Sequence, residues 1–442
     1  MKDQREDIYL DMESKKMLAS NLAASLNIPP DITITAVSVP AKPLTPPPAP
    51  KHANRNSIHS NSKNPTVPMN LMMEALKLET SMDTILFADS VEWCPILQFQ
   101  NILVCGTYQQ REQGDTAEAD GGASCRERVG CIYVLEIKTN LTVKVDQSLI
   151  TAGILDMKWC DRLLNGHPAL GVATAAGELD IYQLIPGKTC ELKLFARAKL
   201  EKESEKEILG LSLDWNKDPS VYQIVISDSH GGLTVFTIDS NGLSQDNHWN
   251  AHGHEAWITC FDRCDSSRIY SGGDDCLFKI FDVRCSDHKA QLTCKTHGAG
   301  VTSLHCNPIS NQYLASGSYD ELLRVWDVRK MKHLINSINL GGGIWRIKWD
   351  PESGVNLATA CMYNNFHLVA DHGDKLEVVT SFKENSSIAY GIDFCHYGKE
   401  EMKRNFNFDT NYRYYLLAMC SFYDHKLFIA SVNVDKIGSP ES

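Results

Sequence analysis

One histidine, one serine and one aspartate, which together could carry out ester or amide hydrolysis, occur as a spaced set twice in the chain. The two sets are His254, Ser271 and Asp275, and His297, Ser316 and Asp320. In a hydrolytic triad the histidine takes the proton of the serine hydroxyl and the aspartate orients the histidine. Such a triad is needed only once in an enzyme, so the recurrence favours a structural origin.

Other chemistry-bearing clusters are small. AHGHE (251–255) contains two histidines and a glutamate, and DHGD (371–374) is a second short cluster. A metal needs three or four convergent ligands, and neither segment supplies them, so no metal site is predicted. The common motifs G-x-S-x-G, G-x-x-x-x-G-K-[ST], G-x-G-x-x-G and H-E-x-x-H are absent from the sequence.

The two His-Ser-Asp sets belong to a repeated strand pattern. SGGDDCLFKIFDVR (271–284) and SGSYDELLRVWDVR (316–329) are offset by 45 residues. Each begins with small residues, places an aspartate in a tight turn, and then alternates polar and apolar positions up to an aromatic residue and Asp-Val-Arg. A period of about 40–45 residues with strand patterning is typical of a propeller blade.

Fainter copies of this unit give seven in total. Their first strands are SVEWCP (90–95), ILDMKWC (154–160), LGLSLDWN (209–216), WITCFDR (257–263), VTSLHCNP (301–308), IWRIKWDP (344–351) and YGIDFC (390–395). The last unit stops after its third strand, and residues 82–87 are predicted to supply the missing outer strand and close the ring. The sequence therefore predicts an all-β fold, a seven-bladed WD-repeat β-propeller, which leaves no open sheet edge.

The repeat assigns a structural role to the triad-like residues. In a WD-type blade the histidine, serine, turn aspartate and tryptophan form a buried hydrogen-bonded tetrad, which satisfies the aspartate. The predicted tetrad is His297, Ser316, Asp320 and Trp326. In the preceding unit His254, Ser271 and Asp275 would correspond, with Phe281 in place of the tryptophan.

The first eighty residues have a different composition. They contain no Cys or Trp, and ten of the 17 prolines lie among them. Such a segment buries too little apolar surface to offset its chain entropy. The prediction is a disordered tail over 1–80, the propeller over 81–435 and a short tail over 436–442. Within the first tail, a four-residue spacing could form a short helix, either transient or a docking motif, through Leu18, Leu22 and Leu26.

Charge and cysteine usage limit the partners and the compartment. The formal net charge of −12 argues against nucleic acid, because affinity for it comes mostly from neutralising phosphates. No run of about 18 apolar residues indicates a membrane span, and the start MKDQREDIYL lacks the apolar core of a signal peptide. The 15 cysteines are scattered, with no C-x-x-C pair. Reduced thiols and a cytoplasmic protein are expected.

Several segments within the predicted blades are more specific than the repeat pattern. These segments are ADSVEWCP (88–95), LVCGTYQ (103–109), ILDMKWC (154–160), EAWITCF (255–261), SGSYDE (316–321), GGIWRIKWDP (342–351) and CSFYDH (420–425). Together they resemble the diphthine methyl ester hydrolase family, also called diphthine methyltransferase, over roughly 80–435. One departure is Tyr363, where the family more often has His.

The resemblance implies an esterase of diphthamide biosynthesis that requires no cofactor. Its protein substrate would be translation elongation factor 2. The modified histidine of that factor carries a trimethylammonium group and a methyl ester, and hydrolysis of the ester gives diphthine.

This substrate needs a cradle for the cation, an activated water and a donor to the ester carbonyl. Aromatic faces attract such cations, although any of these aromatic residues could instead pack between blades. The candidates for substrate binding are Trp257, Trp345, Tyr319, Tyr390 and Tyr423, with Asp424 and Glu255 as weaker polar candidates. Arg346 could polarise the carbonyl, and His297 or His254 could act as general base. Cys361 and Cys420 could serve as nucleophiles only if activated.

A non-catalytic function is the alternative. WDVR (326–329) and FDVR (281–284) resemble the W-D-x-R box of propellers that act as substrate receptors of cullin-type ubiquitin ligases. The blade pattern itself supplies half of these residues. A receptor that binds a ubiquitin-ligase adaptor, or a plain scaffold, therefore stands beside the esterase hypothesis.

Overall fold

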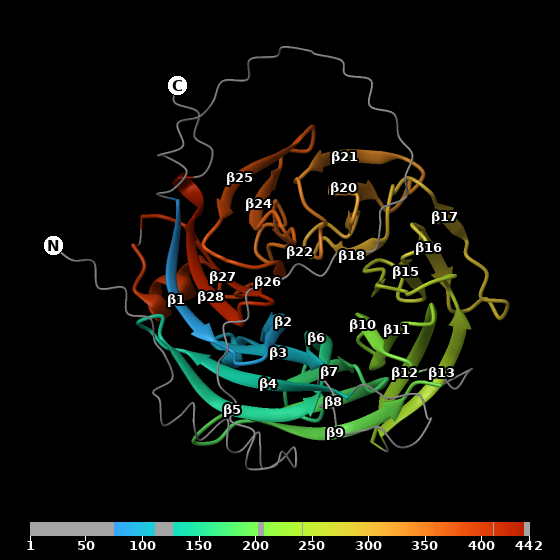
Figure 1. The fold of residues 1–442 in the computed structure, drawn as a ribbon, viewed down its shortest axis with the longest axis horizontal. Coiled ribbons are helices and arrows are strands. Elements are labelled where there is room, and N and C mark those ends of the chain that lie inside the picture. The colour runs from blue at the N-terminus through green and yellow to red at the C-terminus, as the bar shows by residue number, and fades with distance from the viewer. Residues whose placement is uncertain (1–74, 111–126, 202–206, 241, 410, 437–442) are drawn as a thin grey trace, which may run out of the picture. The chain divides into compact units, whose positions relative to one another are not determined.

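The computed structural model describes residues 75–110, 127–201, 207–240, 242–409 and 411–436. These residues form 28 strands in seven four-stranded antiparallel sheets, and the sheets follow one another around a ring (Figure 1). The predicted seven-bladed propeller is confirmed. The tail prediction for residues 1–74, including the spaced leucines at positions 18, 22 and 26, lies outside the described residues, as does the end of the chain from residue 437.

Blades 1 to 6 each use four consecutive strands, from the innermost to the outermost. Blade 1 contains β2 (Phe87–Trp93), β3 (Ile102–Gln110), β4 (Arg128–Ile137) and β5 (Val143–Ala152). Blade 2 contains β6 (Ile154–Trp159), β7 (Ala169–Thr174), β8 (Glu178–Ile185) and β9 (Glu191–Lys199). Blade 3 contains β10 (Gly210–Trp215), β11 (Gln223–Asp228), β12 (Gly232–Asp239) and β13 (Gly242–Asn250).

The second half of the ring repeats this order. Blade 4 contains β14 (Ile258–Phe261), β15 (Arg268–Gly272), β16 (Phe278–Asp282) and β17 (Leu292–Cys294). Blade 5 contains β18 (Val301–Cys306), β19 (Tyr313–Ser318), β20 (Leu322–Asp327) and β21 (Leu334–Asn339). Blade 6 contains β22 (Arg346–Trp349), β23 (Asn356–Ala360), β24 (Phe366–Asp371) and β25 (Leu376–Phe382). The described helices are η1 (Leu97–Phe99), α3 (Lys399–Phe406) and η2 (Val434–Lys436).

Blade 7 is built from both ends of the described chain. Its strands are β26 (Ala389–Phe394), β27 (Tyr414–Ser421), β28 (Lys426–Asn433) and, at the outer edge, β1 (Leu76–Asp83). β1 pairs antiparallel with β28, from Leu76 opposite Val432 to Asp83 opposite Lys426. A spare N-terminal strand thus closes the ring, as Figure 1 shows.

This closing strand lies earlier in the chain than predicted. It occupies Leu76–Asp83, so residues 76–80, expected in the tail, belong to the sheet. Of the predicted stretch 82–87, residues 82 and 83 end β1, residues 84–86 form the turn, and Phe87 begins β2. Ile85 has a φ of 68°, in the left-handed region that ends a strand. Residues 84–86 therefore form a connection, in which Thr84 and Leu86 are buried and the Thr84 hydroxyl donates to the carbonyl of Leu86.

The first strands β2, β6, β10, β14, β18, β22 and β26 lie innermost in the ring (Figure 1), and we call the region that they encircle the channel. The inner edge of each first strand has no neighbouring strand, and its backbone N–H groups need other acceptors. Side chains of the preceding blade accept several of these N–H groups. The pairs, acceptor first, are Asp156 with Leu213, Asp214 with Phe261, His305 with Trp349, and Asp393 with Trp93. The last pair joins blade 7 to blade 1.

The predicted tetrad of blade 5 is only partly formed. Nε2 of His297 lies 2.9 Å from Oγ of Ser316, and Nε1 of Trp326 donates to the same oxygen at 2.8 Å. Asp320 instead accepts two hydrogen bonds from Arg324, at 2.9 and 2.7 Å. Nδ1 of His297 has no partner among the described residues. Arg324 therefore takes the place that the histidine was expected to hold beside the turn aspartate.

In blade 4 the histidine was misassigned. His252 makes the expected contacts, 2.9 Å from Oδ1 of Asp275 and 2.9 Å from Oγ of Ser271. His254 is exposed. The correct residue precedes its serine by 19 positions in both blades, and this equal spacing identifies His252 over His254.

Candidate functional site

The starts of the first strands meet at one end of the channel, which we call the channel mouth. In five first strands the register shifts by one residue near this end, and the unpaired residues are Asp89, Leu155, Leu211, Thr302 and Tyr390. A bulge of this kind redirects a side chain out of the regular alternation. Trp257 and Trp345 precede β14 and β22 at the corresponding positions. The repeat therefore places unlike side chains side by side at the mouth.

Aromatic side chains form a continuous row there, which we call the aromatic arc: Trp257, Trp345, Tyr390 and Phe422. The ring centroids are 5.6 Å apart between Trp257 and Trp345, 4.7 Å between Trp345 and Tyr390, and 4.8 Å between Tyr390 and Phe422. Tyr319 contacts Trp345 at 6.0 Å. Phe422 was not predicted as a binding residue. The only feature of the sequence that indicated it was its position next to Tyr423.

The arc is partly open to solvent. Trp257, Trp345 and Tyr390 are each partly buried, and Tyr423, which contacts Phe422 at 5.0 Å, is 49% exposed. Nε1 of Trp257 donates to Oδ1 of Asp274 at 3.0 Å. These rings pack against one another, in line with the alternative that they serve in packing, but their partial exposure leaves ring surface for a ligand.

Arg346 directly follows Trp345 of the arc in the sequence. Its guanidinium forms an ion pair with a residue on the other side of the channel. Its Nη1 lies 3.2 Å from Oδ1 of Asp156, and both side chains are buried. Burial alone would raise the pKa of Asp156, but Arg346 and Lys158 outweigh it and hold the pKa at about 2. Asp156 also accepts hydrogen bonds from Lys158 at 2.8 Å and Ser212 at 2.9 Å. The arginine is therefore fixed in place by an ionised carboxylate.

Asp89 is the acid of this region that was not foreseen. It is 2% exposed, and its Oδ1 has no hydrogen-bond partner among the described residues. Burial raises the pKa of Asp89 well above its usual value, Arg346 opposes this shift, and Asp156 adds to it. A buried carboxyl with a raised pKa beside a fixed cation is a typical general acid or base. Its only sequence signal was its alignment with Tyr390 at the bulged position.

The two histidines predicted as general bases do not join this group. His297 is buried, and burial together with Arg324 lowers its pKa to about 4. Of its two predicted roles, member of the structural tetrad or general base, the hydrogen bond to Ser316 supports the structural one. The side chain of His254 is exposed and makes no hydrogen bond or ion pair that the structure records within its described part.

The remaining candidates are dispersed. Asp424 accepts hydrogen bonds from the backbone and hydroxyl of Ser386, at 3.1 and 2.8 Å, and so fastens a loop of blade 7. Tyr363 is 75% exposed. Burial raises the pKa of the Cys361 thiol to about 12 and that of Cys420 well above its usual value. Neither thiol is activated as a nucleophile.

Among the described residues, no group of three His, Cys, Asp or Glu side chains is placed to hold a metal ion. In the part of the chain that the structure covers, no helix is both long and apolar enough to cross a membrane.

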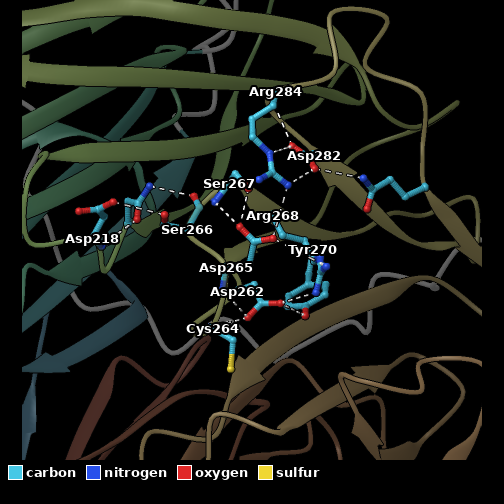
Figure 2. A network of polar contacts seen from close by, with 12 residues as sticks. Asp218, Asp262, Cys264, Asp265, Ser266, Ser267, Arg268, Tyr270, Asp282 and Arg284 are labelled. Atoms are coloured by element: carbon cyan, nitrogen blue, oxygen red, sulfur yellow. Dashed lines mark hydrogen bonds and ion pairs between the residues drawn. The ribbon is translucent and has the colours of Figure 1, made fainter.

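The two arginines of the W-D-x-R-like segments are paired within the chain. Arg284 contacts Asp282 at 2.8 and 2.5 Å, and Figure 2 shows this pair beside the network of Asp262, Asp265 and Arg268. Arg329 contacts Asp327 in the same way, at 2.8 and 2.7 Å. Both guanidinium groups remain exposed. An adaptor protein would have to recognise arginines that already have an acidic partner.

Comparison with known proteins places the chain among its relatives. A family model described as WD domain, G-beta repeat, matches residues 288–327. The chain is 37% identical over 376 residues to the diphthine methyltransferase homolog of Dictyostelium discoideum, with 77% of this chain and 95% of that protein covered. It is 35% identical over 346 residues to the diphthine methyltransferase of Homo sapiens, covering 73% of this chain and 75% of that protein.

A solved structure supports the fold alone. A chain of the crystal structure of the mitotic checkpoint complex matches with a TM-score of 0.58 and 15% sequence identity, covering 85% of this chain and 98% of that one.

Proposed function

The chain belongs to the diphthine methyltransferase family, and from that premise we propose that it is a carboxylic ester hydrolase of diphthamide biosynthesis. The proposed reaction removes the methyl ester of diphthine methyl ester on the modified histidine of translation elongation factor 2. One observation supports this chemistry above the others. A buried carboxyl, Asp89, whose Oδ1 has no hydrogen-bond partner among the described residues, and a fixed guanidinium, Arg346, lie at the channel mouth, which the aromatic arc borders.

The aromatic arc accounts for recognition of the trimethylammonium group. A quaternary ammonium offers no hydrogen-bond donor, so the π faces of Trp and Tyr are its natural partners. Trp257 and Trp345 meet edge to face at 5.6 Å, and Tyr319 adjoins Trp345. Asp274, which Trp257 holds at 3.0 Å, adds a negative charge next to these rings.

In the proposed reaction Arg346 donates to the ester carbonyl oxygen and stabilises the negative charge that develops there. Asp89 takes a proton from a water molecule as the water oxygen attacks the carbonyl carbon. The tetrahedral intermediate then loses methoxide, which accepts the proton from Asp89 and leaves as methanol. The products are methanol and the carboxylic acid, which ionises at neutral pH.

The cationic substrate would also prepare the base. Burial keeps Asp89 protonated to a higher pH than usual, and a base must be ionised to act. A positive charge nearby favours the ionised carboxylate. Binding of the trimethylammonium group would therefore lower the pKa of Asp89 when the substrate is in place.

The direct test uses elongation factor 2 that carries the methyl ester. After incubation with the purified full chain, the mass of the modified peptide should fall by the mass of one CH₂ group, and methanol should appear in equal amount. An unchanged mass under conditions where the protein is folded would refute the esterase.

The receptor alternative predicts a different result. A stable complex with a ubiquitin-ligase adaptor, lost in the double variant Arg284→Ala and Arg329→Ala, would accompany the unchanged mass. The exposure of both guanidinium groups supports this alternative. Their pairing with Asp282 and Asp327 argues against it.

A further inference from the structure

A cavity lies at the end of the ring away from the channel mouth, where the first strands finish. This cavity holds about 100 Å³ of space open to water, which is enough for a small ion with a few waters. Its charged lining consists of Lys158, Lys217, Arg263 and Lys348 as cations, and Glu92 and Asp214 as acids. The lining therefore has more basic than acidic side chains.

Most of these charges are already paired. The ion pairs are Lys158 with Asp156 at 2.8 Å, Lys217 with Asp161 at 3.1 Å, and Lys348 with Glu92 at 2.5 Å. Asp214 accepts the N–H of Phe261 at 2.9 Å. Burial raises the pKa of Glu92 to about 7, although Lys348 opposes the shift. Near neutral pH Glu92 is therefore only partly ionised.

Arg263 is the exception among the cations. It lines the cavity and is partly buried. Its guanidinium makes no ion pair or hydrogen bond that the structure records with the described residues. A guanidinium carries five N–H donors in a planar fork, a shape that matches two oxygens of a carboxylate or phosphate.

His305 supplies a second donor in the same cavity. Its Nδ1 accepts the backbone N–H of Trp349 at 2.9 Å, so a neutral ring must carry its proton on Nε2. Burial and the cations Lys348 and Arg263 hold the pKa of His305 well below its usual range. The ring is therefore neutral and has one N–H left for a ligand.

From these contacts we propose that the cavity binds a small oxyanion, a carboxylate or a phosphate. Arg263 donates hydrogen bonds to two oxygens of the anion, and Nε2 of His305 donates one further hydrogen bond to it. The anion supplies the ion-pair partner that Arg263 lacks among the described residues. This site lies away from the channel mouth and does not depend on the esterase activity.

The test titrates the full chain separately with inorganic phosphate and with acetate, at constant ionic strength set by chloride. Calorimetry and tryptophan fluorescence give the readout, since Trp159 also lines the cavity. We expect saturable binding of at least one anion. Arg263→Gln should weaken it at least tenfold, and Arg263→Lys should weaken it less, because the charge remains while the fork is lost.

Arg284→Gln is the matched control, because it removes the same charge from an exposed arginine of the same part of the chain. It should bind as the unchanged chain does, and thermal melting should show both variants folded. Stronger binding of acetate than phosphate would identify a carboxylate ligand, and the reverse a phosphate. Absence of saturable binding of both anions, or equal loss in Arg263→Gln and Arg284→Gln, would overturn the proposal.

Discussion

Nη1 of Arg346 lies 3.2 Å from Oδ1 of Asp156, and the two residues come from blades 6 and 2, on opposite sides of the channel (Figure 1). A buried ion pair holds its two partners in place when further hydrogen bonds support it, and Asp156 also accepts hydrogen bonds from Lys158 and Ser212. The guanidinium is thereby held where the buried carboxyl of Asp89 also acts on it electrostatically.

Replacing the proposed base should abolish most of the activity and spare the fold. In Asp89→Asn the amide keeps the shape of the carboxyl but cannot take a proton, so kcat for ester hydrolysis should fall about 10²–10⁴-fold. Mass spectrometry of the modified peptide measures the turnover. Asp424→Asn, a change at a loop-fastening carboxylate, should leave kcat nearly unchanged. Equal activity of Asp89→Asn and the unchanged chain would exclude Asp89 as the base.

Arg346 should matter for both rate and stability. Arg346→Met removes the carbonyl donor, and kcat should fall about 10²–10³-fold. It also leaves Asp156 buried without its cation, which should cost about 3–5 kcal/mol of unfolding free energy. Arg346→Lys keeps the charge and separates the two effects, because it should restore stability more fully than rate. If Arg346→Lys were fully active, the fork geometry would be irrelevant to the reaction.

The aromatic arc should govern substrate affinity. Trp345→Ala removes the ring that contacts both Trp257 and Tyr390, and the loss of a cation–π contact of about 0.5–2 kcal/mol should raise KM several-fold. Trp345→Phe should recover part of this loss. Tyr412→Ala changes a partly exposed aromatic residue outside the arc and serves as the control. A methyl ester lacking the trimethylammonium group should bind the unchanged chain and Trp345→Ala equally.

Glu92 should make stability fall as pH rises. Its pKa increases from 4.5 to about 7 on folding, mainly through burial. Between these values the folded state binds more protons than the unfolded state, so the unfolding free energy decreases with rising pH in this window. Glu92→Gln lacks this loss and should gain stability relative to the unchanged chain from pH 4.5 to about 7. Urea unfolding at both ends of the window measures the difference.

The matched variant for this experiment is Glu400→Gln, which changes an exposed glutamate of α3. Its pH dependence should follow that of the unchanged chain. Parallel curves for Glu92→Gln and the unchanged chain would show that Glu92 titrates normally in the folded protein.

Closure of the ring should depend on β1. A chain that begins at Thr84 lacks this strand and leaves the β28 edge of blade 7 unpaired. We expect a lower melting temperature and a stronger tendency to aggregate than for a chain that begins at Ala75. Circular dichroism melts and light scattering compare the two chains. Identical melting would mean that the ring closes without its outer strand.

The sequence by itself determined the blades. Each unit is defined by local features, namely alternating strands, a tight turn and a period of about 40–45 residues, and these needed no knowledge of distant neighbours. The closing strand was predicted in kind but not in position. The connection at 84–86 contains Ile85 and Leu86, and hydropathy alone cannot distinguish such a short apolar segment from part of a strand.

The functional residues were predicted only in part, because their partners lie on other blades. Charged residues at every second position of the first strands, such as Asp156, Lys158, Arg346 and Lys348, are visible in the sequence. Which of them meet is decided by the ring. Closure brings Arg346 to Asp156 and Lys348 to Glu92. Among the described residues it leaves Oδ1 of Asp89 without a hydrogen bond and Arg263 without an ion pair. The local pattern determines on which side of a strand each side chain lies. Only the closed ring determines which residues of other blades that side chain contacts.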